Sequence, residues 1–153
     1  MHSIETLKLS GRLSIVVTDK DGGVKDPREI DNLVVNAGLA YIISRMVGTA
    51  KNVMSHMGLG AGTTAAAATD TDLESSLGSR EALDSSTITG TDNNKVVYVA
   101  TFEPGDSTGA VTEAGIFNAS TGGDMLCHTV FPVINKQADD TVAVTWTITL
   151  TAA

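Results

Sequence analysis

The sequence predicts a mainly β protein, an antiparallel sandwich or barrel with one short helix. Several segments alternate apolar and polar residues with a period of two, which is typical of half-buried strands. Turn-forming residues separate these segments at intervals of about 8–12 residues. The chain has 153 residues, enough for one domain with a single core. We therefore expect one β-sandwich domain over residues 1–153, in which residues 1–6 could form a flexible N-terminal arm.

The N-terminal elements are predicted to be a β-hairpin. In residues 7–17 one face holds apolar side chains and the other holds polar ones. The apolar face is Leu7, Leu9, Leu13, Ile15 and Val17, and the polar face is Lys8, Ser10, Arg12 and Ser14. Residues 19–23, Asp-Lys-Asp-Gly-Gly, supply turn chemistry. Residues 24–35 then return as an antiparallel partner that is interrupted near Pro27.

A helix is expected at about residues 37–47, with Asn36 as its N-cap and apolar residues at helical spacing. Because it is short, packing rather than intrinsic propensity must hold it. A long loop of small residues follows at about 60–86. Within that loop, Thr69 and Asp72 resemble a capping pair for one or two helical turns.

The other predicted strands are 53–59, 96–102, 110–118, 125–134 and 141–150. The last of these has one apolar face and one polar face that is rich in threonine and carries no charge. Natural sheets protect exposed edges with lysine, proline or bulges. A strand without such protection should therefore be central in its sheet, or covered by another subunit.

Charge and cysteine content exclude several classes of function. The net charge is −8, and residues 52–153 contribute −9 of it while residues 1–51 contribute +1. This acidic balance argues against binding to a nucleic-acid backbone. A single cysteine excludes an internal disulfide framework and a four-cysteine zinc site. Neither a signal peptide nor a membrane-spanning run is predicted.

The segment GLGAGTT at 58–64 is the nearest approach to a phosphate-binding loop. It lacks the Gly-Lys-Ser/Thr ending and the dinucleotide-binding spacing, so the end of a strand is the better interpretation. His56 could pair with Glu103 or Glu113, although a packed or surface histidine is favoured. Cys127 and His128 are neighbours on one strand and should point to opposite faces, with Cys127 in the core.

Glu113 lies among small and apolar residues, where we expect a structural acid that accepts hydrogen bonds from the backbone or from Arg80. A less favoured alternative is a carbohydrate-active enzyme that uses Glu113 with Glu103 or Asp106. No catalytic residue, metal site or cofactor is predicted, because no acid or base partner recurs at a defined spacing.

Several strings together resemble a known family: NLVVNAG at 32–38, MSHMGLGAGTT at 54–64, VTEAGIFN at 111–118, VFPVINK at 130–136 and VTWTI at 144–148. Their order over about residues 7–151 is similar to that in the cement, or capsid-decoration, proteins of tailed bacteriophages. The resemblance implies a jelly-roll-like sandwich that binds the phage major capsid protein, as dimers on the outer capsid surface of the virion. It implies no enzymatic activity. Similar strings also occur in phage tail-fibre and receptor-binding accessory proteins, which are the alternative.

Two candidate surfaces follow from these expectations. The contact with the shell is expected to use Met1, His2, Ser3 and Ile4 together with the basic residues Lys20, Lys25 and Arg28. Self-association is expected to use the threonine face of the last strand, or an edge near it. The residues of that face are Thr141, Thr145, Thr147 and Thr149.

Overall fold

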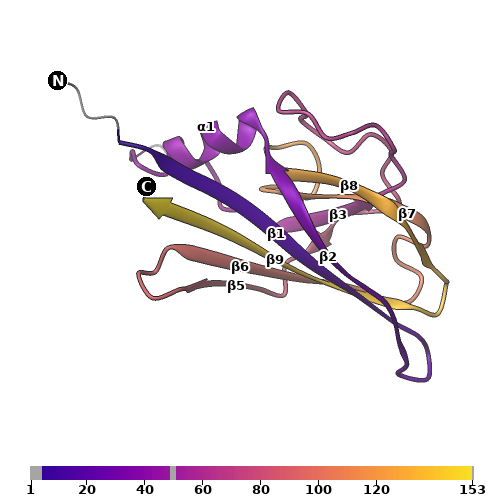
Figure 1. Ribbon diagram of the computed structural model, residues 1–153. Helices are drawn as coiled ribbons and strands as arrows, with labels where there is room; N and C mark the ends of the chain where they lie inside the picture. The colour runs from indigo at the N-terminus through magenta and orange to yellow at the C-terminus, as the bar shows by residue number, and fades with distance from the viewer. Residues whose placement is uncertain (1–4, 49–50, 153) are drawn as a thin grey trace.

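The computed structural model describes residues 5–48 and 51–152, which form one antiparallel sheet of nine strands and one helix (Figure 1). The elements in chain order are β1 Leu7–Thr18, β2 Val24–Val34, α1 Asn36–Ser44, β3 His56–Gly60, β4 Glu81–Ala82, β5 Ser85–Thr89, β6 Lys95–Phe102, β7 Gly109–Phe117, β8 Met125–Lys136 and β9 Thr141–Ala152. Their order in the sheet is β4-β3-β7-β8-β2-β1-β9-β6-β5. The mainly β prediction is confirmed. The jelly-roll connectivity is not confirmed by this strand order.

The sheet curls strongly, so that its two halves face one another. Pairing between β2 and β8 is limited to Leu33 with His128 and Val34 with Cys127, and the sheet folds over at this narrow junction. The two edge strands, β4 and β5, are separated by only two residues of chain. Because a two-residue connection is short, the opposite edges of the sheet come together there. In a closed barrel these two edges would be joined by hydrogen bonds. We call the open boundary between them the seam.

The predicted N-terminal hairpin is present as β1 and β2, with a bulge where Pro27 was expected to interrupt it. The register shifts between Ile15 and Val17, which face Arg28 and Lys25 respectively. Asp26, in the resulting two-residue bulge, has a φ of 48°. Such a bulge bends the strand and lets proline, which cannot donate a ladder hydrogen bond, remain within it.

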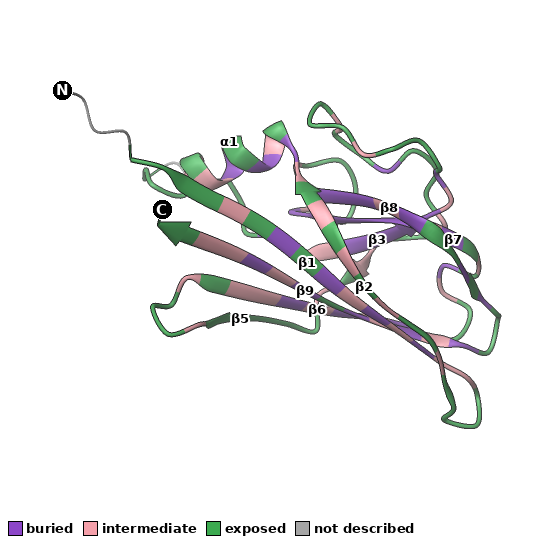
Figure 2. Ribbon diagram, viewed as in Figure 1, coloured by how far each residue is buried: buried purple, intermediate pink, exposed green. Residues whose placement is uncertain are grey.

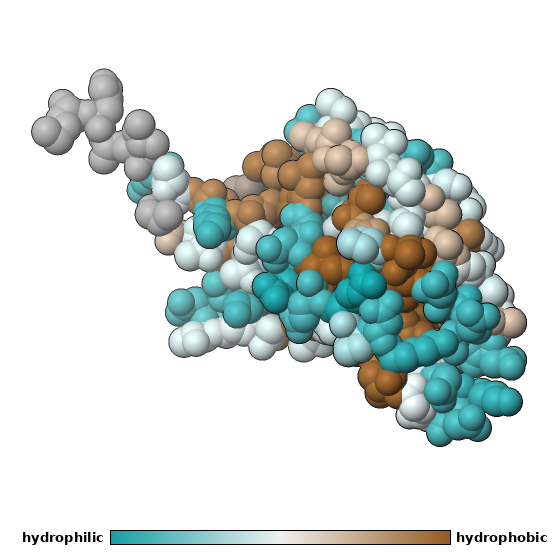
Figure 3. Space-filling model, turned by 45° about the vertical axis from the view of Figure 1, so that its right-hand side comes forward, coloured by the Kyte–Doolittle hydropathy of each residue, from teal (hydrophilic) through white to brown (hydrophobic). Residues whose placement is uncertain are grey.

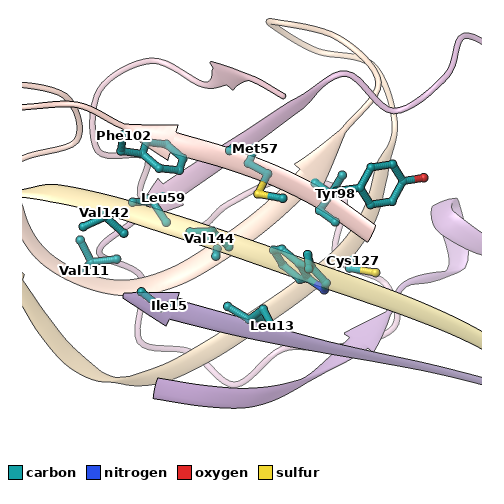
Figure 4. Close-up of a cluster of buried hydrophobic side chains, with 14 of the residues drawn as sticks. Leu13, Ile15, Met57, Leu59, Tyr98, Phe102, Val111, Cys127, Val142 and Val144 are labelled. Carbon is teal, nitrogen blue, oxygen red and sulfur yellow. The ribbon is translucent and has the colours of Figure 1, made fainter. Parts of the chain in front are cut away.

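The core lies between the two halves of the sheet, where alternate side chains of β1, β6 and β9 meet those of β3, β7 and β8 (Figures 2 and 4). Trp146 of β9 is fully buried at its centre. Its indole Nε1 donates a hydrogen bond of 2.9 Å to Oδ1 of Asn32. Gly11 makes room for that amide, since a Cβ at this position would lie 2.0 Å from Oδ1 of Asn32.

The last strand is central, as its uncharged threonine face predicts. β9 pairs along its length with β1 on one side and with β6 on the other. Val142, Val144 and Trp146 point into the core. The intervening threonines lie on the outer face of the sheet. Since both edges of β9 are hydrogen-bonded within the chain, no other subunit is needed to cover its backbone.

The helix differs from its prediction in its limits and in its N-cap. α1 covers Asn36–Ser44, Val35 rather than Asn36 is the N-cap, and no side chain caps the helix. Gly38 and Tyr41 are its buried residues. Within the described residues, no helix has the length and apolar character needed to cross a membrane.

The long loop is shorter than expected and contains no helix. The predicted turns at Thr69–Asp72 adopt turn and bend conformations instead. Two strands, β4 and β5, occupy part of the range assigned to the loop. The sequence of β5 shows no apolar–polar alternation, because neither face of this strand is buried and all five of its residues are exposed.

Candidate functional site

Three titratable side chains, from β7, β8 and the loop between β3 and β4, form one largely buried cluster. His128 on β8 stands between two carboxylates: its Nε2 lies 2.9 Å from Oε1 of Glu113 on β7, and its Nδ1 lies 2.7 Å from Oδ2 of Asp70. Glu113 is fully buried and His128 is 3% exposed. Each ring nitrogen of His128 thus lies within hydrogen-bonding distance of a carboxylate oxygen. We call these three residues the Glu113 cluster.

The loop between β3 and β4 is wrapped around the carboxylate of Glu113. Backbone N–H groups of Gly62, Glu74 and Ser75 donate to it over 2.7, 2.9 and 2.8 Å respectively. With the bond from His128, the carboxylate accepts four hydrogen bonds. One side chain therefore fixes both ends of a loop that has no regular secondary structure of its own.

Two glycines of the GLGAGTT segment allow this close approach. A Cβ on Gly62 would lie 2.2 Å from Oε2 of Glu113, and one on Gly60 would lie 2.7 Å from the same atom. The prediction that the segment forms the end of a strand is confirmed, since β3 ends at Gly60. The loop does bind an anion through its backbone, and that anion is the protein's own carboxylate.

The electrostatics of the cluster favour charged carboxylates. Burial alone would raise the pKa of Glu113, but hydrogen bonds from Ser75 and the other donors of the loop outweigh it and lower that pKa. The pKa of Asp70 is also lowered, mainly by the hydrogen bond from the backbone N–H of Ala67 and further by His128, although burial opposes the shift. Both carboxylates of the cluster are therefore charged at neutral pH.

This arrangement supports structure better than catalysis. Glu113 has no exposed surface for a substrate, and its oxygens are occupied by hydrogen bonds, which disfavours its use with Glu103 or Asp106 on a glycan. The nitrogens of His128 point in opposite directions, so the two carboxylates and the ring cannot share one metal ion. Across residues 5–48 and 51–152, no group of three His, Cys, Asp or Glu residues could hold one.

The sequence suggested two donors to Glu113, the backbone and Arg80. The backbone donors are present, but Arg80 makes its contacts elsewhere. Its guanidinium donates to the carbonyls of Ala119 and Gly122, over 2.9 and 2.8 Å, and lies 3.4 Å from the centre of the Phe117 ring. It also pairs with Asp72 at 3.2 Å. These contacts border a polar hollow of about 410 Å³, lined by Asp72, Ser76, Gly78, Ser79, Arg80, Ser120, Thr121 and Gly122.

The other candidate ligands are separated in the fold. Cys127 is fully buried, as predicted, and burial raises the pKa of its thiol far above the usual range. His128 points to the opposite side of β8, as expected, but it is buried as well because the loop covers that side. His56 bonds the hydroxyl of Ser55 at 2.8 Å, and this is the side-chain bond that His56 makes within the described chain.

The basic residues predicted to contact a capsid do not form one patch. Lys25 pairs with the buried carboxylate of Asp140 at 2.7 Å. Arg28 pairs with Asp26 and donates to the carbonyls of Pro132 and Val133. Both therefore stabilise the hairpin and its neighbours.

Lys20, the third predicted basic contact, is exposed at the tip of the hairpin, beyond the end of β1. It makes no ion pair with a described residue. Met1, His2, Ser3 and Ile4 lie outside the described residues.

The predicted threonine residues of the self-association face lie together on the outer side of the sheet. Thr145 is exposed, and Thr141, Thr147 and Thr149 are half-buried. A shallow hollow of about 550 Å³ runs over this face. Its lining is polar and includes charged side chains from neighbouring strands, namely Arg12, Glu29, Asp31 and Lys95.

The helix carries an apolar side that faces outward. Leu39, Ile43 and, just beyond the helix, Met46 and Val47 are 47%, 64%, 78% and 59% exposed. The inward side approaches β8 so closely that a Cβ on Gly38 would lie 2.2 Å from the carbonyl oxygen of Leu126. Figure 3 shows hydrophobic surface in brown on this part of the molecule. Sequence periodicity identified these apolar residues but not the direction in which they face.

An apolar opening lies between α1 and the β5–β6 edge of the seam. Two adjoining recesses of about 200 and 240 Å³ share Tyr41, Ile88, Val96 and Tyr98 in their linings. Ile88 on β5 is 69% exposed at their mouth, and Val53 is 57% exposed. We call this feature the seam recess.

Sequence reasoning missed the Glu113 cluster as a unit. A lone acid among small residues indicated burial, and strand alternation placed His128 opposite Cys127. The third residue, Asp70, sits in an irregular loop whose path is set by the hydrogen bonds to Glu113. No local pattern could therefore have joined it to the other two.

No protein-family model matches the chain, and searches of the curated proteins and of the solved structures returned no match.

Proposed function

We propose that this chain is a non-enzymatic structural protein of a phage virion, a cement protein that binds the outer surface of the capsid and stabilises the lattice of the major capsid protein. The proposal includes a jelly-roll-like ancestry for the curled sheet. It also includes synthesis in the cytoplasm of the bacterial host before attachment to the particle.

The outward apolar side of α1 carries this proposal. Leu39 and Ile43, four positions apart, share one face of the helix, and Met46 follows in the turn directly after the helix ends. Contiguous apolar patches on a soluble surface mark interaction sites. Leu39, Ile43 and Met46 therefore provide a contact that suits a protein partner.

The ionic residues with partners inside the chain support a structural role as well. The Glu113 cluster fixes a loop, and Lys25 and Arg28 fix the hairpin, so charged side chains are used to hold the fold. A partner that binds only the mature lattice stabilises that state by mass action. A rigid domain with an acidic solvent side would also keep decorated particles apart.

The test compares the protein content of purified virions. Wild-type virions should carry many copies per shell, whereas a few copies at the tail would contradict the proposal. Phage carrying Ile43→Asp with Met46→Asp should lose the protein from the shell. Val133→Asp is the control, because Val133 is 45% exposed on β8, outside the predicted shell contacts, and its replacement should leave occupancy unchanged.

The same assay tests the N-terminal arm separately. Removing residues 1–6 should lower occupancy if the arm contributes to the contact. Unchanged occupancy would assign the contact to the helix alone.

A tail-fibre or receptor-binding accessory role is the second candidate, and the hydroxyl-lined hollow beside Arg80 favours it. Four serine or threonine side chains and one guanidinium converge there, and such groups can donate to sugar hydroxyls. Specific binding on a glycan array, abolished by Arg80→Ala, would support this role. Normal host adsorption by phage lacking the protein would contradict it.

A further inference from the structure

We infer that two copies of this chain associate through β5, which pairs antiparallel with the β5 of the second copy about Thr87. The inference refines the self-association that the proposed function includes, and moves it from the threonine face of β9 to the edge of the sheet. It commits to a second copy as the occupant of this edge.

β5 is an unprotected edge. It lies at one end of the strand order, and its residues, Ser85-Ser86-Thr87-Ile88-Thr89, are all exposed. Figure 2 shows the strand in green along the border of the molecule. It carries no lysine, proline or other charge, although natural sheets use such residues to prevent edge pairing. By contrast, the opposite edge, β4, has only two residues and is too short to add a strand.

The strand is complementary to itself. In an antiparallel pair centred on Thr87, that residue faces its own copy, Ser86 faces Ile88 and Ser85 faces Thr89. Threonine pairs across strands are favourable, and no like charges face one another. The two Ile88 side chains lie on the inner side, next to small serines, at the mouth of the seam recess. Pairing would thus cover an isoleucine that the single chain leaves exposed.

The charges flanking β5 are also complementary. Asp84 precedes the strand, and its carboxylate accepts a bond of 2.7 Å from Thr101 on the outer face. Lys95 pairs with Thr89 at the other end of the strand and is exposed on the same face. A two-fold axis at Thr87 brings the Lys95 of the second copy to the end that holds Asp84. Each end of the paired strands then has one cation and one anion.

The register can be tested by disulfide formation. In a Thr87→Cys variant the two new thiols face each other across the axis, within the Cα separation of about 4.4–6.8 Å that a disulfide requires. Under mild oxidation this variant should form a covalent dimer. In the matched Ser85→Cys variant the thiols are displaced by four residues, about 13 Å, and should not crosslink. The native Cys127 is fully buried and does not interfere.

The mass of the free protein, measured by light scattering or sedimentation, tests the association itself. The wild-type chain should be a dimer, and Thr87→Lys should raise its dissociation constant about tenfold or more, because two ammonium groups would face each other. Thr145→Lys, on the β9 face, should leave the dimer intact.

A monomeric wild-type protein, equal crosslinking of both cysteine variants, or dissociation by Thr145→Lys alone would overturn the inference. Because no capsid is present in these measurements, they can fail while capsid binding succeeds, and the reverse.

Discussion

The two ends of the molecule differ in whether their unusual residues are paired within the chain. Around Glu113, an irregular loop is held by buried charges whose hydrogen-bonding groups are matched one by one. At the α1 and β5 end, regular elements leave apolar side chains and strand edges uncovered. The Glu113 end thus has an irregular backbone whose buried polar groups are hydrogen-bonded. The α1 and β5 end has regular secondary structure whose apolar side chains and strand edge are exposed.

This difference distinguishes residues that stabilise the fold from residues that are available to bind a partner. A cluster of histidine and carboxylates invites a catalytic interpretation, yet its burial and complete pairing indicate a role in folding. Plain residues such as Ile43 and Ile88 carry no reactive group, yet their exposure requires an explanation. Changes at the Glu113 end should therefore affect stability, and changes at the α1 and β5 end should affect association.

The largest loss of stability is expected from Glu113→Ala. Removing the carboxylate leaves three backbone N–H groups and Nε2 of His128 without the oxygen that each of them faces. Each buried hydrogen-bonding group left unpaired costs about 1–3 kcal/mol, so we expect a total loss of about 3 kcal/mol or more. Urea denaturation should show this decrease in the free energy of unfolding.

Glu29→Ala is the control for that experiment. Glu29 pairs with Arg12 at 2.7 Å, but both side chains are 60% exposed. Exposed pairs contribute about 1 kcal/mol or less. If the two variants lose equal stability, the distinction between the two ends is wrong.

A smaller loss is expected from Gly38→Ala, on the inward side of α1. Alanine normally favours a helix by up to about 1 kcal/mol over glycine. Here its methyl group would meet the carbonyl oxygen of Leu126, and overpacking of this kind costs about 1–3 kcal/mol. Thermal unfolding should show a net loss. Gly48→Ala, with no atom within 4 Å of the added Cβ, should show none.

The sequence contained enough information for most strands, and for a physical reason. β1 and β9 have one buried face, so hydrophobic alternation predicted them, and the charge-free face of β9 indicated its central position. β5 has no buried face and therefore no such pattern. The extent of α1 was overestimated because Met46 and Val47 continue the helical spacing although they do not pack on the core.

The candidate site could be predicted only in part. The burial of Cys127 and the structural role of Glu113 followed from local context. The partners of Glu113 depend on the path of residues 61–80, which no periodic pattern encodes. Likewise, the pairing of Lys25 with Asp140 joins segments more than a hundred residues apart, so Lys25 was assigned to the capsid contact from its charge alone.

Acid should weaken the Glu113 end in a predictable direction. The pKa values of Glu113 and Asp70 are lowered in the folded state. The unfolded chain, with ordinary pKa values near 4, therefore binds protons first as the pH falls. The stability that these two carboxylates contribute should be complete above about pH 5 and should be lost as the pH falls below about 4.

Asp70→Asn tests whether the cluster is the source of that decrease. The asparagine amide carries no charge, so the variant loses the hydrogen bond between His128 and a charged carboxylate. Its free energy of unfolding at neutral pH should therefore be about 1–2 kcal/mol lower. Its stability should then depend less steeply on pH between 4 and 3. Urea titrations at several pH values give both quantities. An unchanged slope would assign the acid sensitivity to other carboxylates.

The smallest effect on stability is expected from Ile43→Asp, on the outward side of the same helix as Gly38. Its side chain is 64% exposed, so its replacement should change the free energy of unfolding by no more than about 0.5 kcal/mol. A wild-type urea midpoint together with lost occupancy on virions would separate interaction from folding within one helix. A loss of stability as large as that of Gly38→Ala would show that the chain itself covers this side, and the apolar strip could then no longer be regarded as a contact for another protein.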